Sequence, residues 1–150
     1  MPILGLNAKT YIGSGTVATP VWGAPDGLVR DETVNLTTAL ADVTTRSAQG
    51  WRLQVSTLTE GTVDGQILYD TTNTDFDLIR SAFFAKLSLL MGFFDGLVTI
   101  PGSEGLVGAF MVTNFSIPRM LEEALMVDVT FTATADSAGK PPAWKTIPTP

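Results

Sequence analysis

The sequence contains neither cysteine nor histidine among its 150 residues. Without cysteine, the chain has no disulfide framework and no thiol nucleophile. Without histidine, it lacks the side chain that most often serves as a general base or a metal ligand in proteins. These absences argue against an enzyme, and we expect no catalytic, cofactor-binding or metal-binding residues.

Charged residues are scarce as well. They make up 16% of the chain, against about 25% in typical globular proteins. The 9 Lys and Arg are scattered and outnumbered by 15 Asp and Glu, so the net charge is −6. A surface that holds nucleic-acid phosphates needs clustered cations, which argues against tight nucleic-acid binding. A low charge content also hints at a chain whose surface is partly covered by subunit interfaces.

Long hydrophobic runs are missing too. No stretch approaches the ~18–20 consecutive apolar residues of a membrane-spanning helix. Residues 1–13 have no basic region ahead of a long apolar run. The sequence therefore predicts no membrane partner and no secretory leader, and we expect the chain to be made in a cytoplasm-like compartment.

What remains is mostly a pattern of β-strands. Alternating apolar and polar residues, bounded by Gly, Pro and Asp, are typical of half-buried strands. The pattern predicts a hairpin of 51–57 and 62–70 around a turn at 59–61, and a longer hairpin of 106–117 and 124–134. Further strands are predicted at 3–12, 16–22, 28–37 and 88–96, and a loop at 38–50.

One segment has the periodicity of a helix. Thr74 is a suitable cap, and Asp75 and Asp77 would lie in the first turn, where the helix dipole favours negative charge. Apolar residues then recur at helical spacing. The pattern predicts a single helix over 75–87 that covers a sheet.

The end of the chain is rich in proline and has an isolated Trp144. Such a composition is typical of an extended segment rather than a packed element. We therefore predict a domain of residues 1–134 followed by an extended C-terminal arm of residues 135–150.

Two short motifs resemble ligand-binding loops. Residues 13–18, Gly-Ser-Gly-Thr-Val-Ala, fit the G-x-G-x-x-A pattern of dinucleotide-binding proteins, but Pro20 excludes the helix that must follow. Residues 70–75 are rich in oxygen ligands, as in a calcium loop, but lack its central Gly and terminal Glu. We interpret the first as a turn and the second as a turn with a helix cap.

The segment 41–52, ADVTTRSAQGWR, has a different character. It combines an acid, two Arg, several hydroxyl groups and a Trp, which are too many hydrogen-bonding groups for a core segment. Its residues alone leave open a catalytic site, a ligand clamp or an interface that holds chains together.

This segment is also part of a resemblance that runs through most of the chain. The segments LGLNAKTYIGSGT, VRDETVNLT, ADVTTRSAQGW, LYDTTNTDFDLIRSAF and NFSIPRMLEEALMVDVTFTAT resemble the tail tube (major tail) proteins of long, non-contractile-tailed bacteriophages. The resemblance implies a mainly β subunit with a β-sandwich or barrel-like tail tube fold, flanked by one α-helix at about 75–87. Residues 1–134 would then be the tail tube domain.

The same resemblance implies a structural role in the virion tail. Hexameric rings would self-assemble in the host cytoplasm and stack into a tube through which DNA is ejected. The partners would be further copies of the chain, the tape measure, tail terminator and distal tail proteins, and DNA in transit. The alternatives are the tube of a related injection machine, such as a tailocin or a secretion system, and a carbohydrate-binding β-sandwich that uses Trp22, Trp51 and Trp144.

A channel for DNA needs a wall that does not hold phosphates. Acidic or hydroxyl-rich surfaces repel or lubricate DNA, whereas Lys and Arg would trap it. The strand 124–134 has an apolar side and a polar side. We therefore predict Asp128, Thr130 and Thr132 as lumen-facing residues.

Subunit interfaces are expected at the irregular segments. The segments 38–50 and 135–150 would bridge stacked rings. Within the first, Asp42, Arg46 and Arg52 are expected to form ion pairs or hydrogen bonds between subunits, and Trp51 to anchor the return of the loop into the sheet. The predicted interface residues are Asp42, Arg46, Trp51, Arg52 and Trp144.

Overall fold

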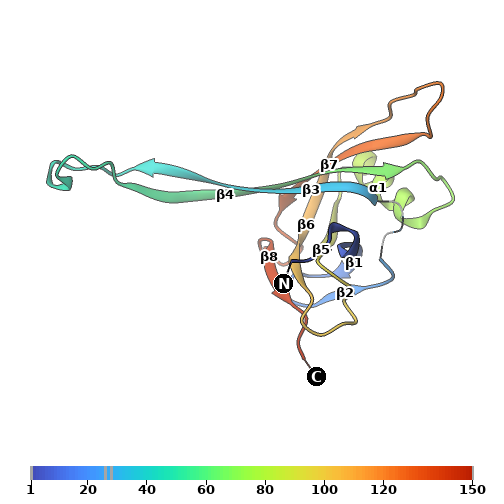
Figure 1. Cartoon of the computed structure of the whole chain (residues 1–150), viewed down its shortest axis with the longest axis horizontal. Helices are drawn as coiled ribbons and strands as arrows, with labels where there is room; N and C mark the ends of the chain where they lie inside the picture. The colour runs from blue at the N-terminus through green and yellow to red at the C-terminus, as the bar shows by residue number, and fades with distance from the viewer. Residues whose placement is uncertain (1, 26, 28, 150) are drawn as a thin grey trace.

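A computed structural model describes residues 2–25, 27 and 29–149, so Met1, Asp26, Leu28 and Pro150 lie outside the described part of the chain. The described residues form eight strands, one α-helix and two short 3-10 helices (Figure 1). In chain order the elements are η1 (Gly5–Asn7), β1 (Lys9–Gly15), β2 (Pro20–Trp22), β3 (Val29–Asp42), η2 (Arg46–Ala48), β4 (Gln54–Leu68), α1 (Thr74–Ala85), β5 (Ser88–Phe94), β6 (Glu104–Ser116), β7 (Met126–Thr134) and β8 (Ala143–Thr146).

All eight strands belong to one antiparallel sheet with the order β2-β1-β5-β6-β7-β4-β3, to which β8 is added by pairing with β6. Strand β5 lies along one edge of β6, and β8 and β7 follow each other along its other edge. The two ends of the sheet approach each other, since the Thr10 hydroxyl on β1 donates to the Glu32 carboxylate on β3 at 2.7 Å. The predicted mainly β, sandwich-like fold with one helix is confirmed.

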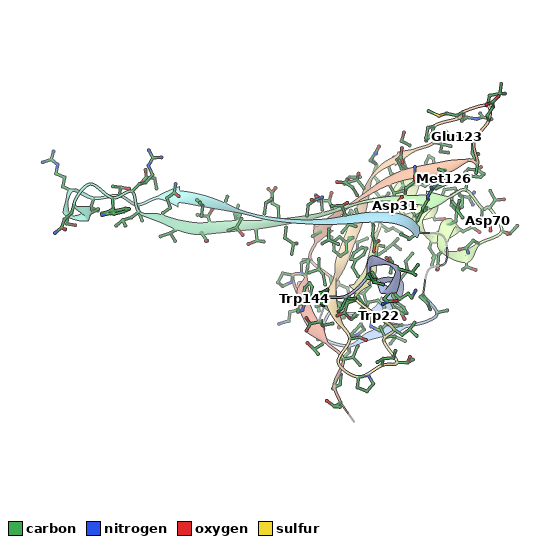
Figure 2. All side chains as sticks on the ribbon, viewed as in Figure 1. Trp22, Asp31, Asp70, Glu123, Met126 and Trp144 are labelled. Atoms are coloured by element: carbon green, nitrogen blue, oxygen red, sulfur yellow. The ribbon has the colours of Figure 1, made fainter. Side chains whose placement is uncertain are left out.

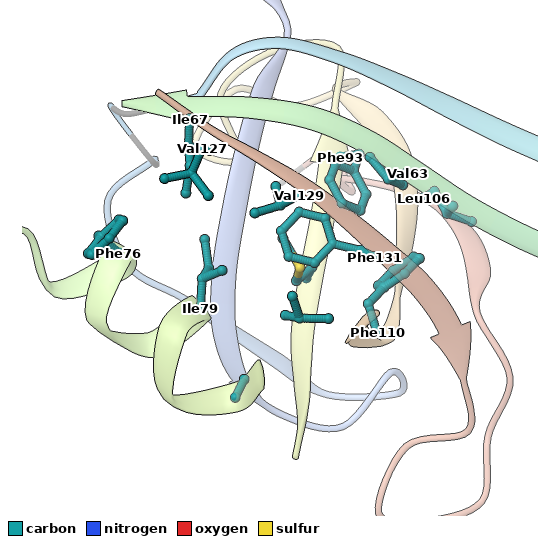
Figure 3. Packing of buried hydrophobic residues seen from close by; sticks show 13 residues of the cluster. Val63, Ile67, Phe76, Ile79, Phe93, Leu106, Phe110, Val127, Val129 and Phe131 are labelled. Carbon is teal, nitrogen blue, oxygen red and sulfur yellow. The ribbon is translucent and has the colours of Figure 1, made fainter. Parts of the chain in front are cut away.

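The curled sheet encloses a core of 13 buried residues (Figure 3). Phe93 on β5 and Phe110 on β6 meet edge to face, with ring centroids 5.3 Å apart. Val63 on β4 and Phe131 on β7 contribute from the other half of the sheet. Each fully buried side chain of this size contributes about 1.5–3 kcal/mol by removing apolar surface from water, so this cluster is the main source of subunit stability.

Helix α1 covers this core, as predicted. Its N-cap is Asn73 rather than Thr74: the Asn73 side chain accepts hydrogen bonds from the amides of Asp75 and Phe76 at 2.8 and 3.3 Å, and such a cap contributes about 1 kcal/mol. The helix buries one side against the sheet, through Phe76, Ile79 and Ala82.

A second, smaller cluster of buried residues shows why the first position of the G-x-G-x-x-A pattern is a glycine. Trp22 packs against Tyr11 and Phe94, with ring centroids 6.0 and 5.7 Å away. Its indole lies over Gly13 and Gly92, where an added Cβ would come within 2.6 and 2.9 Å of ring atoms. Gly13 therefore makes room for an indole, and β1 continues into a hairpin with β2.

The predicted hairpin between 51–57 and 62–70 is wrong. Strand β4 runs straight through the predicted turn and pairs along its length with β3, which itself extends into the predicted loop 38–50. Gly61 lies opposite Leu36, and a Cβ at Gly61 would come within 3.0 Å of Leu36 Cδ2. This glycine makes room for a cross-strand leucine and does not turn the chain.

The ends of other predicted strands also shift. Residues 3–8 are not part of a strand, because the Asn7 amide bonds to the Leu4 carbonyl at 2.9 Å in η1 and β1 begins only at Lys9. Within the predicted strand 16–22, only β2 is extended and paired. The longer hairpin predicted at 106–117 and 124–134 is confirmed as β6 and β7.

The C-terminal residues pack on the sheet, although the sequence predicts no packed element there. Strand β8 pairs with β6 from Val107↔Ala143 to Glu104↔Thr146. Pro141 and Pro142 precede the strand and Pro148 follows it, so none of these prolines has to supply an amide to the ladder. The preceding turn is fixed by the Asp136 carboxylate, which accepts hydrogen bonds at 2.8–2.9 Å from the amides of Val17, Ala138 and Lys140.

The stabilisation of this turn by Asp136 should depend on pH. Its hydrogen bonds, first of all that from the Val17 amide, hold the pKa of the Asp136 carboxyl below its usual range. A pKa lowered by folding means that the carboxylate stabilises the fold above the ordinary aspartate pKa, and that this contribution is lost as the pH falls through the folded-state value. We expect Asp136→Asn to lower the thermal unfolding temperature at pH 7 and to have less effect at about pH 3. Equal losses at both pH values would contradict this role.

Candidate functional site

A long hairpin of β3 and β4 projects from the body of the molecule (Figure 1). The two strands pair from Val29↔Ile67 out to Asp42↔Gln54. On its other edge, β4 pairs with β7 only from Thr62 onward. The outer part, residues 36–61, therefore has no third strand beside it in the described chain, and we call it the projecting hairpin.

The projecting hairpin continues the apolar side of the sheet beyond the core that would cover it. Val34, Leu36 and Leu40 share one side of β3, and Val34 lies opposite the buried Val63. Their exposed fractions rise outward, from 39% to 53% and 57%. Leu58, on the partner strand, is also largely exposed. Monomeric proteins rarely expose an extended apolar surface of this kind, which indicates an interaction surface.

Four of the predicted interface residues meet at the end of this hairpin, residues 42–53, which we call the hairpin tip. Arg52 Nε lies 3.6 Å from Asp42 Oδ2. Asp42 also accepts hydrogen bonds from the Thr44 hydroxyl and amide, which hold the pKa of Asp42 below its usual range. Because the side chains are exposed, these contacts shape the tip more than they stabilise the fold.

Arg46 and Trp51 are the groups of the tip that remain available to a partner. No ion pair among the described residues involves Arg46. Trp51 is 76% exposed and precedes β4, which begins at Gln54. The prediction that Trp51 anchors the loop's return into the sheet is therefore wrong for the single subunit. Arg and Trp are residue types that protein interfaces favour.

The second candidate surface is the outer, polar face of the sheet. Asp128, Thr130 and Thr132 alternate along β7 with buried apolar residues. The Thr130 hydroxyl donates to the Asp64 carboxylate on β4 at 2.8 Å, and the Gln66 amide donates to Asp128 at 3.4 Å. The hydrogen bonds join the side chains of two strands into one surface, which we call the polar face.

Strands β4 and β3 extend the polar face beyond the residues predicted from the sequence. Strands β4 and β7 contain no Lys or Arg, and the one cation of β3, Arg30, lies 3.8 Å from the Asp31 carboxylate. The polar face is thus rich in hydroxyl groups and acids. Further residues pair across it in register: Asp64 with Thr33, Thr62 with Asn35, and Glu60 with Thr37.

No protein-family model matches the sequence, and no curated protein matches it. Among solved structures, the chain is similar to a protein from the virion of the native gene transfer agent particle. The TM-score is 0.70 with 13% identity, over 97% of this chain and 100% of the other.

Two further structures are similar. One belongs to the tail of the empty gene transfer agent particle, refined with C6 symmetry, with a TM-score of 0.69 and 15% identity over 97% of this chain and 98% of the other. The other belongs to the SPP1 tail tube, with a TM-score of 0.65 and 12% identity over 87% of this chain and 75% of the other. The chain has the tail tube fold. Because the first two matches cover 97% of the chain, the projecting hairpin is part of this fold and not an addition to it.

Within the tail tube fold, one predicted interface residue lies apart from the others. Trp144 is on β8 and is 62% exposed, whereas Asp42, Arg46, Trp51 and Arg52 are at the hairpin tip (Figure 2). The structure therefore divides the predicted interface residues between the body and the hairpin.

The described residues contain no group of three or more acidic side chains placed to hold a metal ion. Residues 70–75 form a turn and a helix cap, as predicted, with the Asp70 carboxylate accepting a hydrogen bond from the Thr72 amide at 2.9 Å. Among the described elements, no helix is long and apolar enough to cross a membrane.

Proposed function

We propose that this chain is a structural, non-enzymatic subunit of a virion tail tube. Hexameric rings of the chain stack into a self-assembled tube whose channel conducts DNA during infection. The observation that carries the proposal is the projecting hairpin, whose apolar side is uncovered in the single chain. The three similar structures support it, since they come from a virion, from a tail with C6 symmetry and from a tail tube.

The edges of the sheet support closure of the ring. Strand β3 pairs with β4 on one edge, and no described strand pairs with its other edge. An open strand edge attracts the pairing of another chain and is an aggregation hazard unless it is covered. A closed ring of identical contacts covers every such edge. The open edge of β3 therefore joins the sheet of the neighbouring subunit, so that the sheets continue around the channel.

Two segments stack the rings: one extends away from this sheet, and the other lies on its outside. Residues 38–50 reach farthest from the body along the long axis of the molecule (Figure 1). They bring Asp42, Arg46 and the neighbouring tip residues to the next ring. The segment 135–150 contributes through Trp144, which is exposed on β8.

The polar face forms the wall of the channel. Asp128, Thr130 and Thr132 face the lumen together with the acids and hydroxyl groups of β3 and β4. A wall of this kind lets DNA pass without holding it. The tape measure occupies the channel before DNA does, and the tail terminator and distal tail proteins bind the two ends of the tube, which is assembled in the host cytoplasm.

Asp128→Lys should convert the channel into a trap for DNA. The new cation would repeat in every subunit of every ring, and clustered cations bind phosphates with a steep dependence on salt. We expect tubes of this variant to retain short single-stranded DNA about tenfold more strongly than wild-type tubes at low salt, with most of the difference lost by about 0.2 M salt. Asp128→Asn is the matched control without the cation. Equal retention by all three proteins would place Asp128 outside the channel.

The alternatives differ in observable ways. A tube of a related injection machine would assemble in the same manner but would not be joined to a DNA-filled head. A carbohydrate-binding module would need its indoles on one platform, yet Trp22 is half-buried and packs against Tyr11 and Phe94. Glycan binding by a monomer would favour that module.

Negative-stain microscopy of the purified chain, with sedimentation over a range of protein and salt concentrations, tests the proposed function. We expect rings at low concentration and tubes at high concentration. Monomers under every condition would contradict it.

A further inference from the structure

The end of the molecule opposite the hairpin tip has exposed apolar side chains of its own. The loop that joins β6 to β7, residues 117–125, lies at the other end of the long axis (Figures 1 and 2). Met120 is 62% exposed and Leu121 is 100% exposed in this loop. Trp51 is similarly exposed at the tip. Each end of the molecule thus presents apolar surface that the body of the subunit does not cover.

The two ends also carry opposite charge. At the tip, Arg52 is paired with Asp42, which leaves Arg46 without an ion pair among the described residues. The loop 117–125 contains Glu122 and Glu123, both exposed and likewise outside the ion pairs of the described chain, against the single cation Arg119. The tip is therefore locally basic, and the loop is locally acidic.

We propose that the hairpin tip of one copy docks on the loop 117–125 of a copy in the next ring. Trp51 packs on Met120 and Leu121, and Arg46 pairs with Glu122 or Glu123. This inference rests on the proposed function and adds to it the surface that receives the hairpin. A large indole in an apolar site is the usual anchor of a protein interface, while the charged pair at its rim fixes the register and favours the correct partner.

The shape of the molecule makes this contact one between copies. The tip and the loop belong to opposite ends of the same chain, so a chain does not satisfy its own contact. A contact that joins one end of a subunit to the other end of the next is heterologous, and its repetition produces an open filament rather than a closed dimer. The same contact, repeated by every subunit of a ring, produces a stack of rings.

Cross-linking tests the contact directly, because the chain has no cysteine of its own. Ser47→Cys with Ala124→Cys places one thiol in the tip and one in the loop by small changes that spare Trp51 and Arg46. Under mild oxidation of assembled tubes, we expect a ladder of covalent multimers on a non-reducing gel. The matched control, Ser47→Cys with Ser81→Cys, keeps the first thiol, moves the second to an exposed position on α1, and should give no ladder.

Exchanging the charges of the tip and the loop tests the contact independently. We expect Arg46→Glu to raise the protein concentration needed for tube formation by about tenfold, because it opposes like charges at the contact. Adding Glu122→Arg and Glu123→Arg to this variant should restore assembly. Lys86→Glu, an equal change of charge on the exposed end of α1, should have little effect.

The outcomes separate the two proposals. If the wild-type chain forms tubes, but Ser47→Cys/Ala124→Cys tubes give no ladder and Arg46→Glu does not impair assembly, the docking contact is overturned and the tube function stays intact. A wild-type chain that forms no tubes would overturn both. A ladder together with rescue by the exchanged charges would establish the contact.

Discussion

Shortening the projecting hairpin is expected to abolish tube formation, whereas the subunit should remain folded. Thr37 and Glu60 are partners in the register of β3 and β4, so an Asn-Gly turn between them can replace residues 38–59 with the connection that two-residue hairpins favour. The deletion removes the tip and the exposed Leu40 and Leu58, but no residue of the main core cluster. We expect no polymer by sedimentation or microscopy, with cooperative thermal unfolding retained.

A full-length control separates the effect of hairpin length from that of its apolar surface. Leu40→Thr with Leu58→Thr keeps both strands but removes two exposed leucines. Burying a leucine contributes about 1.5–3 kcal/mol, and each 1.4 kcal/mol changes an association constant about tenfold. The concentration needed for assembly should therefore rise at least about tenfold in this variant. Normal tubes from the shortened chain would remove the observation on which the proposed function rests.

Phe110→Ala should destabilise the subunit by about 3–5 kcal/mol, because truncating a buried aromatic ring leaves a cavity in addition to the lost burial. Phe110 is 0% exposed and packs edge to face on Phe93 at the centre of the core. A whole domain is typically stable by about 5–15 kcal/mol, so the loss is a large fraction of the total. Denaturant unfolding in the shortened-hairpin background measures it without interference from polymerisation.

The matched control for this core change is Phe84→Ala. Phe84 lies on α1, the helix that covers the core, but its side chain is 72% exposed. Its effect on the free energy of unfolding should stay within about 0.5 kcal/mol. In the full-length chain, tube formation should offset part of the Phe110→Ala loss by mass action, because only the folded subunit assembles. A Phe110→Ala loss below about 1 kcal/mol would contradict the assignment of the main core.

Local periodicity in the sequence predicts individual helices and strands well, but it predicts poorly which strands pair. Helix 75–87 and the strands at 106–117 and 124–134 each have a pattern confined to one segment, and all three are confirmed with shifted ends. The hairpin of 51–57 with 62–70 is wrong because pairing depends on a distant strand. Only the register with β3 shows that Gly61 accommodates Leu36 instead of forming a turn.

The exposed Trp51 illustrates a different limit. The alternation of Trp51, Leu53 and Val55 predicts a half-buried strand face, yet all three side chains are exposed in the single chain. Under the proposed function, the pattern describes burial in the assembly, and the covering surface belongs to another copy. A sequence pattern indicates that a side chain is buried, but it does not indicate whether the same chain or another copy buries it.

The polar face was predicted in part. The alternation along β7 points to Asp128, Thr130 and Thr132, and similar alternation exists at 31–37 and 62–66. Each strand indicates only that one of its sides is polar. The three polar sides form one continuous surface because the strands lie in the order β7-β4-β3. This order is a non-local property of the fold.

A helical reconstruction of assembled tubes by electron cryomicroscopy tests the central claim most directly. We expect six-fold rings, by likeness to the tail with C6 symmetry, with β3, β4 and β7 around the channel and the carboxylates of Asp64 and Asp128 on its wall. Tubes with the polar face on the outside, or a channel wall lined by Lys and Arg, would contradict the account.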